Sequence, residues 1–425
     1  MISIFKDFLK NKEIRKKILF TLVILFIYRL GSAIPAPGIN DTVISLSANS
    51  ILNMMSLLGG GSIEQMSIFS LGVGPYITAS IIIQLLSMDI IPALTEMAKS
   101  GKKGRQQMDR ITRYLGVVLA LVQGYFIVQL LSNQYSMVDN PGFVSYAYIA
   151  VIFTAGTMFL LWLADQITTK GIGNGVSVII FAGIVADMPN NFKLVYQTFI
   201  GENATSSLGI PGFIIYCLMY IAIIVLVVVM QMAERRISIQ QSSSQRLNKS
   251  KGDLNHLPLK INSASVIPVI FASALIQGPQ IIASWVNTNA YNFLSNLCDF
   301  TNPWFLLFYA VLIILFTFFY TNLTIDPQKM SEDLGKQGQY IPGVRPGSET
   351  KEYVSKVLNR ITCLGALLLT FIALLPYVVS IITGLSQRAA LGGTGIIIVV
   401  GVAMDTIKEL KGQLTTKQYK GFVGK

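Results

Sequence analysis

Charged residues and histidine are scarce in this 425-residue sequence. Only 13% of its residues are charged and 52% are hydrophobic, whereas soluble domains carry about 25% charged residues. The chain therefore lacks the polar surface that a water-soluble fold needs. Its single histidine, His256, lies in a polar stretch, so the apolar segments offer no histidine for a Ser-His hydrolase or a zinc cluster.

Cysteines are few, and nucleotide-binding motifs are absent. The three cysteines are far apart, at Cys217, Cys298 and Cys363, and this spacing indicates neither a disulfide framework nor a metal site. The glycine-rich run at 171–175 has no soluble strand before it and no phosphate-binding lysine at the expected spacing. The sequence contains no Walker motif, which excludes P-loop ATP hydrolysis by this chain.

Long apolar runs are abundant instead. Hydrocarbon offers backbone groups no water, and these runs lack the alternating pattern of barrel strands, so each is predicted to be a membrane-spanning helix. The predicted fold class is all-α, a polytopic membrane protein with ten transmembrane helices. The ten predicted spans are residues 18–34, 68–87, 114–132, 145–164, 172–188, 211–232, 263–286, 303–324, 361–383 and 392–407.

The distribution of basic residues predicts the orientation of the chain. Of the 33 Lys and Arg residues, all but Arg29, Lys193 and Arg388 fall on one side of the predicted spans. The positive-inside rule therefore places both termini in the cytoplasm. The net charge of +12 suits anionic lipid head groups, ribosomal RNA phosphates or an acidic protein partner, and ordinary topogenic charge is the plain alternative.

The ten spans divide into an N-terminal half, residues 1–200, and a C-terminal half, residues 201–425. Five crossings in each half force the halves into opposite orientations, although no convincing internal sequence similarity accompanies this. Inverted repeats commonly build a pathway at the bilayer midplane where the halves meet. Such a pathway is compatible with a channel and with an ion-coupled secondary transporter.

Three segments between the spans carry distinct patterns. The apolar segment 51–58, followed by Gly59, Gly60 and Gly61, predicts a half-helix that enters from one face, or alternatively a surface loop with an interfacial helix. The stretches 233–262 and 325–360 join basic residues to turn formers, which indicates docking surfaces.

Five segments resemble the signature motifs of the SecY family, in family order and at compatible spacing across nearly the whole chain. The departures are exchanges among Val, Ile and Leu and a short tail after residue 407. The matching segments are IFSLGVGPYITASIIIQLL at 68–86, WLADQITTKGIGNGVSVIIFAG at 162–183, HLPLKIN at 256–262 with VIPVIFAS at 266–273, VRPG at 344–347 and GGT at 392–394.

The resemblance implies a protein-conducting channel with an hourglass pore. An aliphatic ring at its constriction can yield around an extended chain and close by dewetting when empty. Within two of the helices the ring positions are spaced i, i+4 and therefore share a face. The ring residues that the resemblance implies are Val73, Ile77, Val176, Ile180, Ile270 and Ile398.

The resemblance also implies a plug and a lateral gate. Residues 50–67 would be the plug, hinged at the three glycines. Spans two and three would face spans seven and eight across the gate, where apolar segments leave for the lipid. Thr78 and Gln123 on one side and Ser273 on the other would form hydrogen bonds of about 1 kcal/mol each while the gate is shut. Local bonds to helix carbonyls are the alternative.

The family resemblance finally implies partners and a location. SecE would clamp the halves, SecG would be peripheral, and the SecA motor or the ribosome would dock through Arg235, Arg236 and Arg345. The substrates would be preproteins with signal sequences, the location the bacterial plasma membrane, and the chain a passive channel subunit without a cofactor.

The rival class, an ion-coupled transporter, usually carries charged residues deep in the bundle. Here Asp165, Asp187 and Asp405 are expected near span ends, and Arg29 is the one clearly internal charge.

Overall fold

Each predicted span overlaps a helix in the computed structural model. This structure describes residues 11–39, 66–88, 90–135, 138, 140–200, 209–241, 256–262, 264, 266–286, 294, 297–298, 300, 302–383 and 387–423. The helices that overlap the ten spans are α2 (Lys12–Ser32), α4 (Gly74–Leu86), α6 (Lys102–Tyr135), α7 (Phe143–Lys170), α8 (Gly175–Phe199), α9 (Gly209–Met232), α10 (Ile267–Val286), α12 (Pro303–Thr324), α14 (Ser348–Thr383) and α15 (Gln387–Val423).

Length and composition identify six of these helices, α6, α7, α8, α9, α12 and α14, as able to cross a membrane among the residues described. The apolar helices α4 and α10 are shorter by the same measure. The predicted class, an all-α polytopic membrane protein, is confirmed.

Several helices extend well past the apolar run that predicted them. Helix α6 begins at Lys102 rather than near 114, and α14 begins at Ser348 rather than near 361. Hydropathy detects only the part of a helix that hydrocarbon can surround, whereas charged residues such as Lys, Glu and Arg continue a helix readily in water. The added turns carry the two helices beyond the predicted membrane region.

Helix α8 corrects one expectation about internal charge. The predicted span ended at 188, but the helix continues through Pro189 to Phe199. Asp187 therefore lies inside the helix and is only 8% exposed, not near a span end. The amides of Asn190 and Asn191 donate to its carboxylate at 3.4 and 3.3 Å, which compensates part of the cost of burial.

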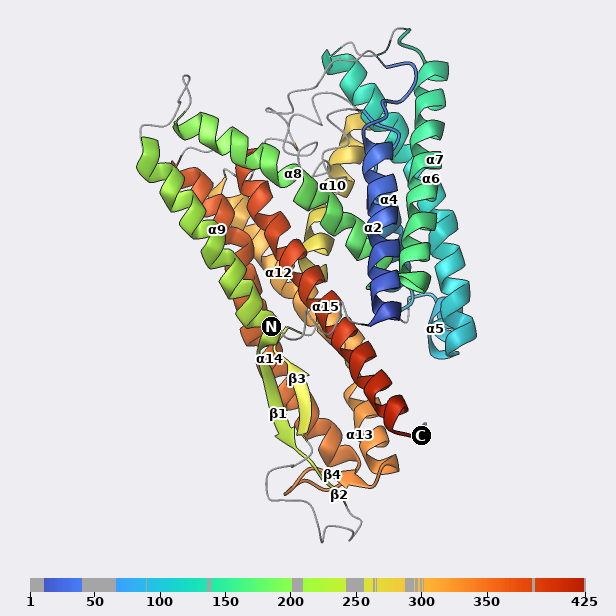
Figure 1. Cartoon of the computed structure of the whole chain (residues 1–425), viewed down its shortest axis with the longest axis vertical. Coiled ribbons are helices and arrows are strands. Elements are labelled where there is room, and N and C mark those ends of the chain that lie inside the picture. The colour runs from blue at the N-terminus through green and yellow to red at the C-terminus, as the bar shows by residue number, and fades with distance from the viewer. Residues whose placement is uncertain are drawn as a thin grey trace.

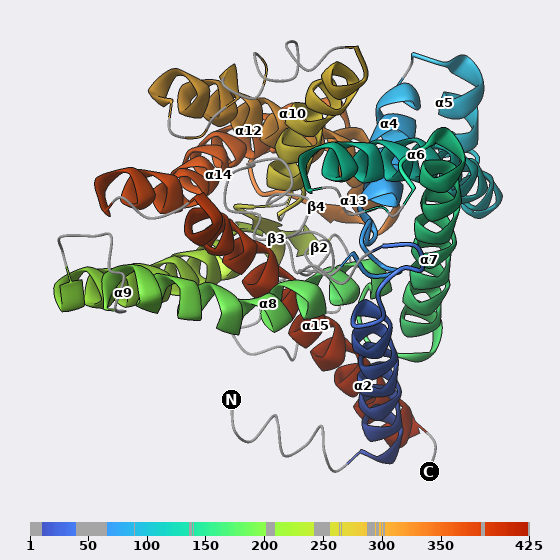
Figure 2. The ribbon, with the colours of Figure 1, turned by 90° about the horizontal axis from the view of Figure 1, so that it is seen from above.

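The helices form two groups with three helices between them (Figures 1 and 2). On one side α6 contacts α4 and α7, and α7 contacts α2; on the other side α14 contacts α9 and α12. Helix α10 contacts α4, α6 and α12, while α15 contacts α8, α9 and α14. One large apolar core runs through both groups.

The two polar stretches that were predicted as docking loops pack together into one small unit. Strand β1 (Glu234–Ser238) pairs antiparallel with β3 (His256–Lys260), and β2 (Gln240–Gln241) pairs antiparallel with β4 (Gln339–Tyr340). The short helix α13 (Pro327–Lys336) and the first turns of α14 complete the unit, at the lower end of Figure 1. We call it the strand module. Its own apolar core consists of Ile237, Leu259, Ile341 and Val354.

The predicted plug, residues 50–67, lies outside the described residues except at its end, and so do the hinge glycines Gly59, Gly60 and Gly61. Met66 and Ser67 are buried against the end of α2. There the Ala36 amide donates to the Met66 carbonyl at 2.9 Å, and Ser67 bridges to Pro35. The last two residues of the predicted plug are thus fixed against the residues that follow α2.

Candidate functional site

A cavity of about 280 Å³ lies where α8, α10 and α15 meet. Three of the six predicted ring residues line it together: Ile180 of α8, Ile270 of α10 and Ile398 of α15. Ile180 and Ile398 are 4% and 5% exposed, and Ile270 is half-buried. Three aliphatic side chains from helices far apart in sequence therefore share one apolar wall.

The other three ring residues lie in the same apolar core without lining this cavity. Val73 caps α4 at its N-terminus and is 1% exposed. Ile77 follows one turn later, and Val176 is the second residue of α8; both are half-buried and pack against the core. A turn with Gly72 at φ +55° delivers Val73 into this position, a conformation that favours glycine.

The cavity also has a polar wall that sequence reasoning missed. Asp405 and Glu409 lie one turn apart on α15 and line the cavity, as do Asn174, the N-cap residue of α8, and Ser177 of α8. The i, i+4 spacing of the two acids is the signal that could have revealed this shared face. Lys408 points elsewhere, since its ammonium donates to the Gln231 carbonyl at the end of α9 at 3.0 Å. The cavity therefore passes from aliphatic to acidic along α15.

The predicted gate residues sit on helices that do meet, because α10 contacts both α4 and α6. The hydrogen bonds that their hydroxyls donate are local, however. Thr78 donates to the Gly74 carbonyl at 3.2 Å, and Ser273 donates to the Val269 carbonyl at 2.8 Å. Ser273 also lies 3.4 Å from the Tyr309 hydroxyl of α12, and Gln123 is half-buried on α6. For Thr78 and Ser273 the structure shows the local alternative.

The predicted docking arginines lie on the surface of the strand module. Arg235 and Arg236 are exposed on β1, and Arg236 forms an ion pair with Glu234 at 2.8 Å. The Arg345 side chain is 87% exposed and 3.8 Å from Glu349. The Thr350 hydroxyl donates to the Arg345 carbonyl at 2.8 Å.

Two glycines with positive φ, at +83° and +103°, flank Arg345 in the chain; they are Gly343 and Gly347. The Ser331 hydroxyl of α13 donates to the Gly347 carbonyl at 2.7 Å. The backbone on both sides of Arg345 is thereby held, while its guanidinium projects into solvent.

Comparison with known proteins gives one consistent result. The SecY family model matches residues 67–407. The Protein translocase subunit SecY of Bacillus licheniformis is 42% identical to this chain over 429 aligned residues, which cover all of both chains.

Two solved structures share the fold at 18% identity, each covering 93% of this chain and 91% of its own. One is described as "The structure of a protein conducting channel", with a TM-score of 0.64. The other is described as "Sec61 in the Canine ribosome-channel complex from the endoplasmic reticulum", with a TM-score of 0.61.

Proposed function

The chain belongs to the SecY family, and from this premise we propose how its geometry conducts a polypeptide. The chain is a multi-pass membrane protein and a channel subunit, not an enzyme. It translocates unfolded preproteins across a membrane and releases apolar segments laterally into that membrane. Membership of this family decides against the ion-coupled transporter that two inverted halves also allow.

The proposed constriction is the aliphatic ring of Val73, Ile77, Val176, Ile180, Ile270 and Ile398. The observation that carries it is the meeting of Ile180, Ile270 and Ile398 at one cavity. A channel for polypeptides must accept every side chain, and an aliphatic collar offers none of them a fixed charged partner. When no chain is present, the same side chains exclude water and hinder the passage of ions.

The proposed lateral gate lies between α4 and α6 on one side and α10 and α12 on the other. The contacts of α10 with α4 and α6 support this placement. Thr78, Gln123 and Ser273 would face the gate, and residues 50–67 would act as the plug beneath the ring, hinged at Gly59, Gly60 and Gly61.

The proposed docking surface is the strand module, which would face the cytoplasm. Arg345, Arg235 and Arg236 would present cations to SecA or to ribosomal RNA phosphates. A relative in fold described in a ribosome-channel complex supports the second partner. ATP hydrolysis would come from SecA, SecE would clamp the two halves, 1–200 and 201–425, and SecG would be peripheral.

The proposed location is the bacterial plasma membrane, with both termini in the cytoplasm. The one-sided distribution of Lys and Arg supports this orientation. The same basic surface would contact anionic lipid head groups.

Reconstitution tests the proposed function. Proteoliposomes that contain this chain with SecE receive SecA, ATP and a secretory preprotein, and protease is then added outside. We expect a protected full-length preprotein that requires ATP and a functional signal sequence. Protection that is independent of ATP, or none while the chain is correctly inserted, contradicts the proposal.

Crosslinking tests the ring. Single cysteines in place of Ile180, Ile270 and Ile398 should crosslink to a translocation intermediate stalled in the channel. Val178 is the matched control, because it is 6% exposed on the same helix but does not line the cavity. Equal crosslinking from Val178→Cys would show that the ring is misplaced.

A further inference from the structure

The turn between α7 and α8 is held by side chains from outside it. The Gly175 amide donates to the Thr168 hydroxyl of α7 at 2.9 Å, and the Ile172 amide donates to the Thr21 hydroxyl of α2 at 3.2 Å. The Asn174 side chain accepts from the Val176 amide at 3.1 Å and so caps α8. The start of α8 is therefore fixed by hydroxyls on two other helices.

Close packing reinforces these hydrogen bonds. A side chain at Gly175 would place its Cβ 1.8 Å from the Ala164 carbonyl oxygen, and one at Gly171 would place it 2.6 Å from the Thr21 hydroxyl. Gly173 has φ +80°, and a Cβ there would lie 3.2 Å from the Thr406 hydroxyl of α15. The turn can approach α2, α7 and α15 this closely only because it carries glycine at these positions.

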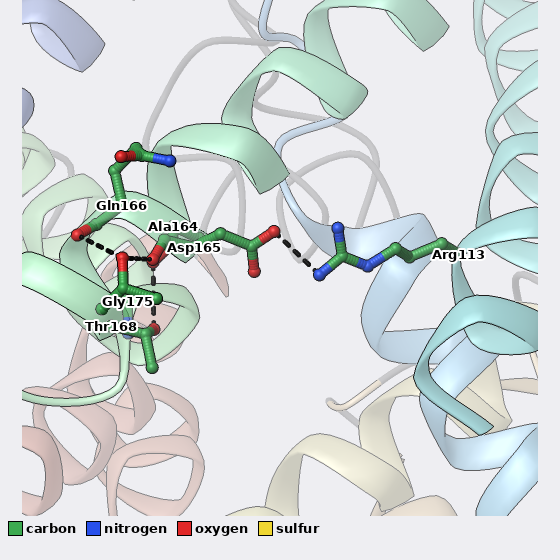
Figure 3. A network of polar contacts seen from close by, with 7 residues as sticks. Arg113, Ala164, Asp165, Gln166, Thr168 and Gly175 are labelled. Carbon is green, nitrogen blue, oxygen red and sulfur yellow. Dashed lines mark hydrogen bonds and ion pairs between the residues drawn. The ribbon is translucent and has the colours of Figure 1, made fainter. Parts of the chain in front are cut away.

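The C-terminal part of α7 also reaches the gate helix α6. The Asp165 carboxylate lies 2.8 Å from the Arg113 guanidinium of α6, and both side chains are about half exposed, at 42% and 44%. Figure 3 shows Asp165 directed toward Arg113 while Thr168 is directed toward Gly175. Residues three apart on a helix share a side, so one helical turn contacts both α6 and the start of α8.

Two ring residues come soon after Gly175 in the chain. Val176 is the first residue after Gly175, and Ile180 comes one turn later and lines the cavity. Any shift of the Gly175 backbone therefore moves both ring residues as part of the same rigid helix.

We propose that Thr168 is a positioning residue, which holds α8 so that Val176 and Ile180 close the constriction, and that the Asp165–Arg113 pair couples the gate helix α6 to this position. The proposal rests on the proposed function of the ring. It adds to that proposed function a physical connection between the lateral gate and the ring, through α7.

Resting ion conductance in planar bilayers tests the first part. Thr168→Val keeps the shape of the side chain but removes the acceptor for the Gly175 amide, along with the bond that the hydroxyl donates to the Ala164 carbonyl of its own helix at 3.0 Å. We expect resting conductance to rise about fivefold, the population change that loss of the bond to Gly175 allows if that bond has a typical value. Thr168→Ser should restore the wild-type conductance, because the hydroxyl is retained.

Thr169→Val is the matched control. Thr169 is the neighbouring exposed threonine, and its hydroxyl donates to carbonyls of its own helix, at Asp165 and Gln166. A tight channel in Thr168→Val, or an equal leak in Thr169→Val, overturns the positioning role. A fall in protein yield without a leak would show a purely structural role and likewise overturns it.

A charge-reversal cycle tests the link to α6. Arg113→Asp and Asp165→Arg should each raise resting conductance about two- to fivefold, the range that a partly exposed ion pair allows. The double variant should return it toward the wild-type value. Additive leaks in the double variant overturn the coupling. Ile180→Gly serves as the reference variant. If Ile180→Gly leaks ions and Thr168→Val does not, the positioning role of Thr168 is rejected and the ring is kept. If Ile180→Gly does not leak, the ring itself is rejected.

Discussion

The cavity and the strand module differ in the side chains that they present. The cavity has one aliphatic wall built by residues from three helices, and backbone amides at and just before the start of α8 donate hydrogen bonds to threonine hydroxyls of α2 and α7. The strand module has a core of only a few apolar residues and displays its arginines on a hydrogen-bonded backbone. In the proposed function, the first surface yields to many substrates, whereas the second presents one charge in one place.

This difference predicts how each region responds to substitution. In the strand module a single change of charge removes a specific contact, so the effect should be all or none. At the cavity several weak apolar contacts act together, so the effect of a substitution should be graded. It should raise resting ion conductance before it impairs preprotein translocation.

The largest effect is expected at Arg345. Arg345→Glu should abolish translocation driven by SecA and insertion from ribosomes, because it places a carboxylate where a fixed cation is proposed to dock. Translocation into proteoliposomes measures the first activity, and cosedimentation with ribosomes measures the binding that the second activity requires.

Lys356→Glu is the matched control for Arg345. Lys356 is also exposed on the strand module, where it forms an ion pair with Glu352 at 2.8 Å. Its reversal should leave both activities within about twofold, as expected for an exposed pair of small energetic value. If both reversals abolish transport, overall charge rather than position governs docking. If neither does, Arg345 has no docking role.

The next largest effect is expected at the ring. Replacing Ile180 and Ile398 together by Gly should raise resting ion conductance severalfold while preproteins still cross, because it widens the constriction without adding a charge. Single-channel recording and the protease-protection assay measure the two properties.

Val178→Gly separates the ring from general loosening of α8. Val178 is buried on α8 but does not line the cavity. Its replacement should lower the stability of the protein by about 1–3 kcal/mol, the range for loss of a buried branched side chain and gain of a helical glycine, without a comparable leak. A leak of equal size would mean that the constriction is not built by the ring residues.

A smaller effect on conductance is expected from the plug. Deleting residues 50–65 removes the predicted half-helix and its glycines, but keeps Met66 and Ser67, which are anchored against Ala36 and Pro35. The ring remains, so resting conductance should rise less than in the ring variant, and translocation should persist. An unchanged resting conductance counts against a plug in this segment.

The sequence predicted the helices well because hydrophobic length has a single physical cause, the thickness of the bilayer. It predicted their ends poorly, since α6 and α14 continue through charged residues that no hydropathy window includes. For the same reason Asp187 was expected near a span end, although α8 continues beyond it and buries it.

The site divides in a similar way. Local spacing places Val176 and Ile180 on one face, but only the fold brings Ile180 to Ile270 and Ile398 at one cavity. The partnership of Arg113 with Asp165 and the shared core of Ile237 and Val354 join segments that no local pattern connects. Pairings between distant segments depend on tertiary packing, and a single sequence carries no direct record of them.

The smallest effect is expected at Ser273, a buried residue that contrasts with the exposed Arg345 of the strand module. Unlike Arg345, Ser273 is 8% exposed, and its hydroxyl already donates to the Val269 carbonyl of its own helix at 2.8 Å. Its other close oxygen belongs to Tyr309 of α12, on the same side of the proposed gate. Removing the hydroxyl therefore takes away bonds on one side of the gate only, within the part of the chain that the structure describes.

Ser273→Ala should consequently shift the gate by less than about 1 kcal/mol, the typical value of one interhelical hydrogen bond in a membrane. Resting conductance and the efficiency of lateral release of a signal sequence, measured by crosslinking to lipid, should both stay within about fivefold of wild type. Gln123→Leu is the informative companion, because Gln123 is half-buried on α6, which lies on the other side of the proposed gate. If Ser273→Ala opens the gate as strongly as Gln123→Leu does, a cross-gate bond from Ser273 must form in the closed channel, because loss of a bond within α10 alone cannot favour separation of α10 from α6.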